Sequence, residues 1–337
     1  MPLIGPTDPR IVFLLAATTV SAMSVSAGPA VTLPVVQPYH DLATSDINPA
    51  LAAVRAGMTT CVLGFVVASP ADGRTPAWGA AGPANGRTFS NEVARLRDSL
   101  HHLAVSFGGA EHTDLAAIDQ SPDRLASTYE RVCSAYRFAA VDFDVEGVAL
   151  LDRAGMARRA EAWKIWRARR TMPPATLTLP VLPSGLTPDV LTLLAIHRDA
   201  GALPDRLNLM VMNYGPANLP GPAATLDVWA VRALTNTVAQ LRANGMEALV
   251  AGPAGVSRIG LTPMIGRNAV AGEIFQLDDA RRLRVWAVEN QLGLLSFWSL
   301  NRDRSCPTAS TSLHVCSGID QSPQQFLSIF TGPKPNR

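Results

Sequence analysis

The sequence has 337 residues, of which 47% are hydrophobic and 17% charged, which is enough for one large domain with a sizeable core. Its formal net charge of +2 is close to neutral. This charge gives no support for a nucleic-acid partner or an anionic membrane partner, and we expect neither.

The first 27 residues have the pattern of a secretory signal peptide. Arg10 precedes an apolar run from Ile11 to about Ala22, and Val25-Ser26-Ala27 has the small residues of a cleavage site. The run is short for a membrane span, which needs about 20 apolar residues, although an uncleaved anchor is the alternative. We expect a leader at residues 1–27, one domain at residues 28–337, secretion to the extracellular or periplasmic space, and no integral membrane segment.

Along the rest of the chain, short apolar runs alternate with longer helical patterns, which predicts parallel βα units. We expect eight strands, at Thr32–Val36, Thr59–Val67, Leu103–Phe107, Phe138–Val145, Thr176–Val181, Arg206–Met212, Arg258–Thr262 and Leu294–Ser299. Helical patterns lie at Asn91–Leu100, Asp123–Tyr136, Met156–Arg169, Asp189–Ala200, Thr225–Asn244 and Asp278–Asn290. This order predicts an α/β fold, a (β/α)8 TIM barrel.

Three helix starts are marked by their chemistry. Ser121-Pro122, Thr187-Pro188 and Ser322-Pro323 each place a hydroxyl that can cap a helix just before a proline. Proline is favoured at the first helical position, so we expect a helix to begin at each of these pairs.

The predicted fourth strand carries an acid at every second residue: Asp142, Asp144 and Glu146. Side chains alternate faces along a strand, so these acids share one face at intervals of about 6.5–7 Å, while Phe143 and Val145 pack on the other. Like charges beside a buried strand resist desolvation, so stability alone does not explain them. The pattern is typical of a site that keeps one carboxyl protonated and its neighbours ionised.

Two other interpretations fit this stretch less well. Asp-x-Asp-x-Glu-Gly also opens an EF-hand calcium loop, but the twelfth position, which needs a bidentate Glu, is Arg153 here. A solvated edge strand is less consistent with the apolar run Phe138–Val141, which is typical of a strand buried on both sides. Cys-x-x-Cys and His-x-x-x-His spacings are absent from the sequence, so we expect no metal site and no cofactor.

Five stretches, in order, carry a resemblance to a known family. Asp142-Phe-Asp144-Val-Glu146 resembles the Asp-x-x-Asp-x-Asp-x-Glu signature of the family 18 glycoside hydrolases, the chitinases and their relatives, although the first Asp is here Ala139 or a neighbour. Further similar elements are Ser106-Phe-Gly108-Gly109 (family Ser-x-Gly-Gly), Met210-Val-Met212-Asn213-Tyr214-Gly215 (family Met-x-x-Asp-Tyr-Gly), and Thr262–Gly266 and Leu295–Asp303, which resemble the last two barrel strands of bacterial-type chitinases. The resemblance covers nearly the whole chain after the leader.

The resemblance implies roles for the acids. Glu146 would protonate the glycosidic oxygen and later activate water. Asp144 would orient the N-acetyl group of the substrate and stabilise its developing positive charge, with Asp142 holding Asp144 from beneath. The substrate's own acetamido oxygen would be the nucleophile, so the implied reaction is a retaining, substrate-assisted hydrolysis of β-1,4-N-acetylglucosamine linkages.

The resemblance also implies substrate contacts. Tyr214 would hydrogen-bond the acetamido group, and Trp298 would form an apolar floor under the sugar. Met210, Met212 and Tyr214 share one strand parity, so if the methionines face the barrel interior, we expect Tyr214 to face it too. Met212 is then also a candidate substrate-binding residue.

Three further positions near the strand ends are candidate substrate-binding residues. Ser106 and Gly108 belong to the Ser-x-Gly-Gly element, in which glycine permits a close backbone approach. Asn213 replaces the family's Asp. An amide there can still hydrogen-bond but contributes no negative charge.

The cysteines fit an exported protein. Cys306 and Cys316 lie in a Ser/Thr/Pro-rich segment at a spacing that suits a loop-closing disulfide. Cys61 and Cys133 are expected to be buried, small apolar residues.

We expect a monomeric glycoside hydrolase whose partner is chitin or another oligosaccharide that contains N-acetylglucosamine. Two alternatives stay open: a non-catalytic, lectin-like barrel, and an endo-β-N-acetylglucosaminidase acting on glycoprotein glycans. The presence of Glu146 argues against the first, whereas the sequence does not separate chitinase from the second, because loops determine subsite number.

Overall fold

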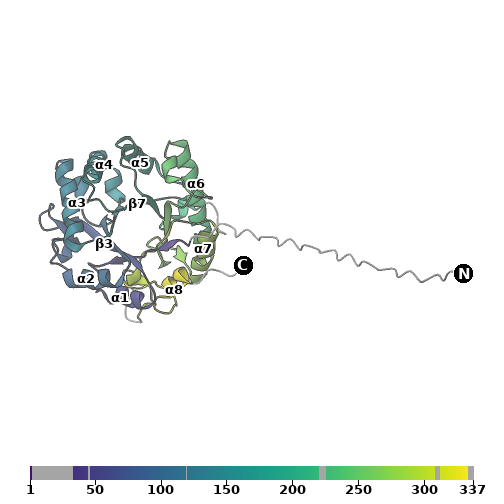
Figure 1. Ribbon diagram of the computed structural model, residues 1–337. Coiled ribbons are helices and arrows are strands. Elements are labelled where there is room, and N and C mark those ends of the chain that lie inside the picture. Colours follow the sequence, from purple (N-terminus) through teal and green to yellow (C-terminus); the bar gives the residue numbers. More distant parts are fainter. Residues whose placement is uncertain (2–32, 45, 119, 220–224, 308–311, 333–337) are drawn as a thin grey trace. The chain divides into compact units, whose positions relative to one another are not determined.

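The computed structural model describes Met1 and residues 33–44, 46–118, 120–219, 225–307 and 312–332. Apart from Met1, the predicted leader at residues 1–27 lies outside the described residues. From Leu33 onward the described residues belong to one compact unit, with strands in an inner ring and helices around it (Figure 1). The predicted (β/α)8 TIM barrel is confirmed.

The inner ring is a parallel sheet that closes on itself. Its strand order is β1, β12, β9, β8, β7, β6, β5, β3, β2. β1 (Val35–Val36) pairs with β12 and β2 (Tyr39–Asp41) pairs with β3, so β1 and β2 act as one interrupted first strand that closes the ring. The other barrel strands are β3 (Thr60–Ala68), β5 (His102–Gly108), β6 (Ala140–Asp144), β7 (Ala175–Pro180), β8 (Arg206–Met210), β9 (Ile259–Thr262) and β12 (Leu294–Leu295).

The first strand reaches further than its predicted range, Thr32–Val36. Thr32 lies outside the described residues, and pairing continues through Tyr39. Pro38 interrupts the ladder because it has no N–H to donate. Tyr39 N then resumes the ladder by donating to Phe297 O at 3.1 Å. The extension carries the Tyr39 side chain into the barrel.

Helices cover the outside of the barrel (Figure 1): α1 (Asn48–Arg55), α2 (Ser90–Ser99), α3 (Pro122–Tyr136), α4 (Arg153–Ala168), α5 (Pro188–Asp199), α6 (Leu226–Ala243), α7 (Leu277–Glu289) and α8 (Gln325–Thr331). Two of the predicted starts are confirmed, because Ser121 Oγ accepts from Arg124 N at 3.2 Å and Thr187 Oγ1 accepts from Val190 N at 3.5 Å. The start predicted at Ser322-Pro323 is wrong. α8 begins only after Gln324, whose left-handed backbone (φ 60°) separates the pair from the helix.

Shorter elements fill the loops, and the sequence patterns did not predict them or α1. β4 (Pro76–Trp78) pairs with β3, and β10 (Gly266–Arg267) pairs with β11 (Ile274–Phe275). The 3₁₀ turns are η1 (Gly79–Ala81), η2 (Leu115–Ala117), η3 (Gly147–Leu150), η4 (Pro216–Asn218), η5 (Glu247–Leu249) and η6 (Leu300–Arg302).

The main core lies between the strands and the outer helices. The Phe143 ring of β6 packs against Phe107 of β5, Tyr129 of α3 and Trp163 of α4, with ring centroids 5.4, 4.9 and 4.9 Å away. Full burial of such a side chain contributes roughly 1.5–3 kcal/mol. A slip of one residue would turn Phe143 inward, so this cluster fixes which face of β6 points into the barrel.

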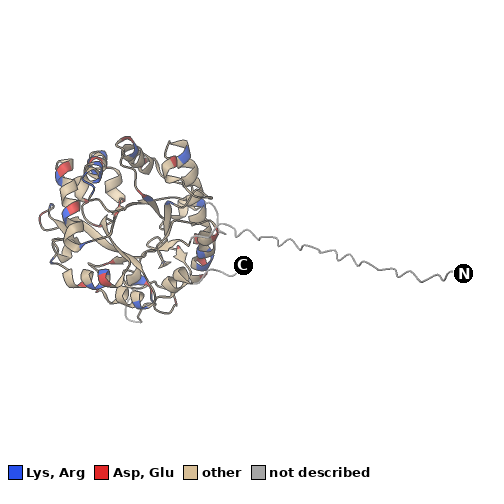
Figure 2. Ribbon diagram, viewed as in Figure 1, with Lys and Arg blue, Asp and Glu red and all other residues tan. Residues whose placement is uncertain are grey.

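Charged residues lie mainly along the outer helices, with both signs interspersed (Figure 2). This distribution agrees with the near-neutral net charge of +2. Within the described part of the chain, none of the helices is both long and apolar enough to cross a membrane.

Candidate active site

β6 presents its acids to the barrel interior. Asp142 and Asp144 are buried on the face opposite Phe143. Strand pairing ends at Asp144, but Glu146 keeps an extended backbone (φ −144°, ψ 177°), so its side chain stays on the same face. Gly147 then turns the chain into η3 with a φ of 54°. The three acids therefore lie in a row, as strand alternation predicts.

Asp142 is the deepest of the three acids. Its carboxylate accepts hydrogen bonds from Ser106 Oγ (2.6 Å), Tyr39 OH (2.9 Å) and Thr178 Oγ1 (2.6 Å). Burial raises the pKa of Asp142 to about 6, and the three hydroxyls oppose the rise because they stabilise the ionised form. Asp142 is thus a rigidly held acid that can exchange a proton slightly below neutral pH.

Asp144 lies between Asp142 and Glu146. Its Oδ1 is buried and has no hydrogen-bond partner among the described residues. Burial raises the pKa of Asp144 well above its ordinary value, and repulsion from Glu146, Asp142 and Asp114 adds to the rise. A buried carboxyl oxygen without a partner is uncommon in folded proteins, and it favours a donor from a ligand at this position.

Gly108 lets the two strands approach beside Asp144. Its φ is 100°, and a Cβ there would lie only 2.1 Å from Asp144 O. Gly109 N donates to the same carbonyl at 2.9 Å. Gly108 and Ser106 do not line the cavity described next. The prediction that they contact substrate is therefore corrected: Ser106 holds Asp142, and Gly108 makes room for the backbone of Asp144.

A cavity of about 900 Å³, which we call the upper cavity, lies at the carboxyl ends of the strands and is lined by Asp144 and Glu146. Glu146 is half-buried, and burial raises its pKa, which favours the protonated form that a general acid needs. Trp298 forms an aromatic wall with Phe65 and Tyr39, at ring-centroid distances of 5.5 and 6.2 Å. Such a wall suits the apolar face of a sugar ring.

Tyr214 is not where strand parity predicted. Asn213 has a left-handed backbone (φ 53°), which breaks the alternation just after β8. As a result Met210, Met212 and Asn213 line the upper cavity, whereas the Tyr214 ring is buried in the main core. The Tyr214 hydroxyl has no hydrogen-bond partner among the described residues. The expectation that Tyr214 faces the barrel interior is wrong.

Asn213 lines the upper cavity, but its side chain also holds a loop. Its Oδ1 accepts from Ala269 N at 2.9 Å and from Val270 N at 3.3 Å. Its backbone N donates to Asn268 Oδ1 at 3.2 Å. The Asn213 side chain therefore holds the segment between β10 and β11 against the cavity wall by hydrogen bonds. An aspartate at this position could accept the same two hydrogen bonds.

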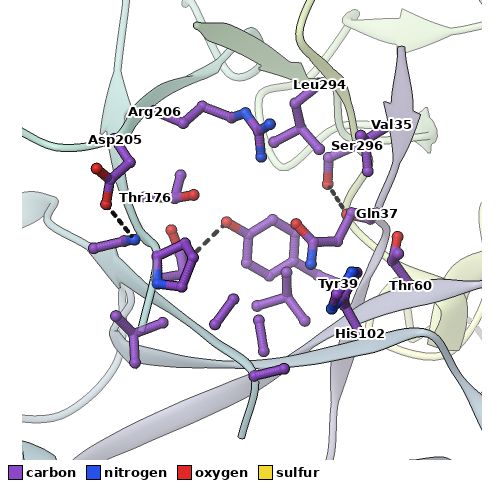
Figure 3. A pocket seen from close by; sticks show the side chains of 18 residues that line it. Val35, Gln37, Tyr39, Thr60, His102, Thr176, Asp205, Arg206, Leu294 and Ser296 are labelled. Carbon is purple, nitrogen blue, oxygen red and sulfur yellow. Dashed lines mark hydrogen bonds between the residues drawn. The ribbon is translucent and has the colours of Figure 1, made fainter. Parts of the chain in front are cut away.

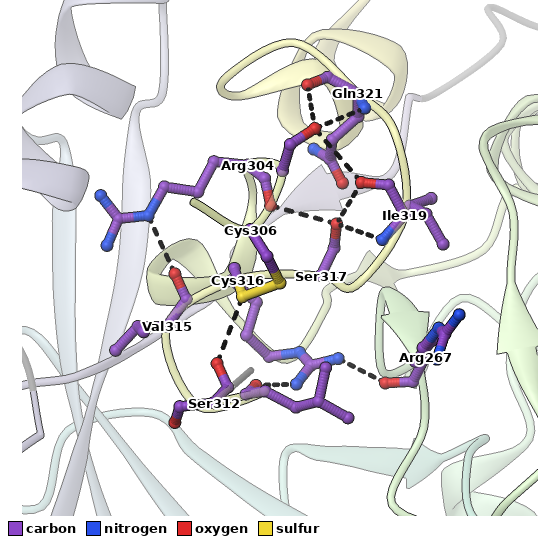
Figure 4. Close-up of a disulfide and its surroundings, with 12 residues drawn as sticks. Arg267, Arg304, Cys306, Ser312, Val315, Cys316, Ser317, Ile319 and Gln321 are labelled. Atoms are coloured by element: carbon purple, nitrogen blue, oxygen red, sulfur yellow. Dashed lines mark hydrogen bonds between the residues drawn. A yellow bond between two sulfur atoms is a disulfide. The ribbon is translucent and has the colours of Figure 1, made fainter. Parts of the chain in front are cut away.

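Cys306 and Cys316 form a disulfide (Figure 4). The buried Arg302 side chain donates to Leu313 O inside this disulfide loop. Leu313 and His314 both line the upper cavity. The disulfide loop thus supplies part of the cavity wall.

Several residues of the site were missed by sequence reasoning, among them Tyr39, Thr178, Leu313 and His314. Thr178 shares the inward parity of Thr176 on its strand, and that parity could have revealed it. Tyr39 was not predicted to face the barrel interior, because the first strand was predicted to end before Pro38. Leu313 and His314 lie in a loop, where no periodicity marks the inward side chains.

Among the described residues, no group of three or more His, Cys, Asp or Glu side chains could hold a metal ion. Cys61 and Cys133 are free and buried, as predicted. Burial raises the pKa of both thiols, which makes them unreactive toward metals and disulfides.

No family model matches the chain. It is 31% identical over 310 residues to the protein of Escherichia coli (strain K12) named "Probable bifunctional chitinase/lysozyme", a match that covers 87% of this chain and 34% of that protein. It is 32% identical over 265 residues to "Endochitinase 11" of Metarhizium anisopliae, covering 74% of this chain and 48% of that protein. The chain thus spans about a third and about half of the length of these two relatives.

Solved chitinase structures are also similar. The catalytic domain of a hyperthermophilic chitinase from Pyrococcus furiosus superposes with a TM-score of 0.74 at 28% identity, covering 89% of this chain and 95% of that chain. Catalytic-site mutants of active domain 2 of a thermostable chitinase from the same organism, complexed with chito-oligosaccharides, give the same TM-score of 0.74 and identity of 28%, covering 90% and 96%. A chitinase from Chromobacterium violaceum shares the fold, with a TM-score of 0.55 at 15% identity and coverage of 88% and 98%. By its motifs, its barrel and these similarities, the chain is related to the family 18 chitinases.

Proposed function

We propose that this chain is a secreted chitinase that hydrolyses β-1,4-N-acetylglucosamine linkages by a retaining, substrate-assisted mechanism. The observation that carries the proposal is the inward row of Asp142, Asp144 and Glu146, whose upper two members line the upper cavity beside Trp298. Similarity to the two proteins named as chitinases supports the substrate class. The leader pattern at residues 1–27 supports secretion.

In this mechanism Glu146 acts first as an acid and then as a base. Its raised pKa keeps the carboxyl protonated to a higher pH than in an exposed Glu, so that it can protonate the glycosidic oxygen. As the bond to the leaving sugar breaks, the acetamido oxygen of the substrate attacks the anomeric carbon and forms an oxazolinium ion. The ionised Glu146 then takes a proton from water, which attacks the same carbon, so two displacements retain the β configuration.

Asp144 stabilises the acetamido group during this step. Its buried Oδ1, which lacks a partner among the described residues, can accept the acetamido N–H. A negative charge there favours the positively charged oxazolinium ion. Asp142 lies beneath, and because like charges so close disfavour double ionisation, the pair Asp142 and Asp144 shares a proton.

Two other functions would use the same cavity. A carbohydrate-binding barrel without activity needs no acid, so the half-buried Glu146 with its raised pKa favours catalysis. An endo-β-N-acetylglucosaminidase would use the same three acids and differ in its substrate. Cleavage of N-glycans from a glycoprotein, without cleavage of chitooligosaccharides, would assign that function instead.

The direct test is hydrolysis of a fluorogenic chitobioside by the wild type and by Glu146→Gln. Glutamine is nearly isosteric but cannot donate the proton, so the rate should fall more than about a hundredfold while chitooligosaccharide binding is kept. Glu111→Gln is a matched control, since Glu111 lines the same cavity but lies outside β6, and it should keep most of the activity. Near-normal turnover by Glu146→Gln would contradict the proposal.

A further inference from the structure

A second cavity of about 330 Å³, the lower cavity, lies at the opposite end of the barrel. Its lining includes the first residues of several strands, namely Val35, Thr60, His102, Ala140, Arg206 and Leu294 (Figure 3). The interior of a (β/α)8 barrel is ordinarily filled by layers of large side chains. Here the small side chains of Ala104 and Ala140 face this space and leave it open.

The guanidinium of Arg206 points into the lower cavity (Figure 3). Its Nε is buried and has no hydrogen-bond partner among the described residues. The side chain as a whole is partly buried, and its two terminal nitrogens, which are not enclosed, have no hydrogen bond or ion pair within the described ranges of the chain. Burial lowers the pKa of Arg206, although the group stays a cation at neutral pH. A cation that is partly removed from water and has no hydrogen-bonded partner favours an anion from a ligand, because such charges in proteins are ordinarily paired.

The two acids nearest the lower cavity are engaged elsewhere. Asp205 Oδ2 accepts from Ala175 N at 2.9 Å and from the Arg167 guanidinium at 3.4 Å. Asp142, at the inner end of the cavity, is held by the three hydroxyls of Ser106, Tyr39 and Thr178. Neither carboxylate hydrogen-bonds to the guanidinium of Arg206, although the nearby charge of Asp205 favours its charged form.

We propose that the lower cavity is a binding site for a small organic monocarboxylate, whose carboxylate pairs with the guanidinium of Arg206. The planar guanidinium fork matches a carboxylate in shape, and a single cation needs a single negative charge. Apolar side chains, among them Val35, Val62 and Leu294, line much of the remaining space. They favour a short hydrocarbon tail over an inorganic ion such as phosphate. The volume of about 330 Å³ suits a small molecule, because known ligand sites start near about 300 Å³.

Butyrate is a suitable probe, with butyramide as its uncharged counterpart of nearly the same shape. Isothermal titration calorimetry and saturation-transfer NMR on the purified chain should show saturable binding of butyrate and none of butyramide. Arg206→Gln should weaken butyrate binding about tenfold or more, because a charged hydrogen-bonded pair is lost. Arg55→Gln removes an exposed arginine from α1, changes the net charge equally, and should bind butyrate as the wild type does.

A second variant tests the location independently of the charge. Ala140→Leu should fill the lower cavity and abolish binding while the guanidinium remains, and circular dichroism verifies that each variant is folded. The proposal is overturned if the wild type shows no saturable binding, if either Arg206→Gln or Ala140→Leu, when folded, binds butyrate normally, or if butyramide or inorganic phosphate binds as tightly as butyrate. None of these measurements involves glycoside hydrolysis, so their failure and a failure of the proposed function are distinguishable.

Discussion

Replacing Asp142 by Asn should change how the stability of the barrel depends on pH. Burial raises the pKa of Asp142 from its ordinary value of 3.8 to about 6. Between these two pH values the folded protein binds a proton that the unfolded chain has already lost, so the free energy of unfolding falls as the pH rises. The difference of about 2.2 pH units corresponds to about 3 kcal/mol, at about 1.36 kcal/mol per unit.

Urea unfolding of the wild type and of Asp142→Asn at pH 4 and pH 7.5 measures this effect. Because the unfolded carboxyl is already partly ionised at pH 4, the free energy of unfolding of the variant, minus that of the wild type, should be about 2.4 kcal/mol more positive at pH 7.5 than at pH 4. Loss of the Asp142 charge also relieves repulsion on Asp144, which acts in the same direction. Asp98→Asn is the control, because its side chain is 69% exposed, and its difference should stay within about 0.5 kcal/mol. If the free energy of unfolding of Asp142→Asn differs from that of the wild type by the same amount at both pH values, the reasoning is refuted.

Tyr39→Phe removes a hydroxyl that donates to Asp142 and should lower kcat about tenfold, whereas Tyr214→Phe loses no hydrogen bond to a described residue and should keep kcat within about twofold. Steady-state kinetics on chitooligosaccharides compare the two, and an equal loss would contradict the core position of Tyr214. Replacing Cys306 and Cys316 by Ser should lower the free energy of unfolding by about 2–3 kcal/mol on loop-entropy grounds, measured by urea unfolding. An unchanged value would argue against the disulfide. Asn213→Asp should keep the fold and move the alkaline limb of the pH–rate profile upward, because a nearby negative charge raises the pKa of the acids. An unchanged profile would leave Asn213 with its loop-holding function alone.

The chemistry of β6 could be predicted from the sequence because one local rule decides it. In an extended strand, Asp142, Phe143 and Asp144 alternate faces, and burial of Phe143 selects which face points inward. Tyr214 could not be placed in this way, since the rule holds only while the backbone stays extended. Asn213 leaves the extended region at a φ of 53°, and its side chain is stabilised by bonds to a loop more than fifty residues later in the chain.

The first strand and the lower cavity show where local patterns stop being informative. Pro38 marks a strand end by its missing N–H, but pairing resumes at Tyr39 because Phe297, just after β12, supplies a carbonyl from the far end of the chain. The lower cavity depends on how Ala104, Ala140 and Arg206 converge from three strands. Their spacing in the sequence does not predict that they lie close together, because only closure of the barrel brings the three strands into this arrangement.

The anomeric form of the first product tests the central claim most directly. NMR during cleavage of a chitooligosaccharide follows the α and β anomers before they equilibrate. If the acetamido oxygen is the nucleophile, two displacements occur on one carbon, the β anomer forms first, and polymers without N-acetyl groups are not cleaved. An α anomer formed first would mean that water attacks directly. The roles given to Asp144 and to the substrate's acetamido group would then be wrong.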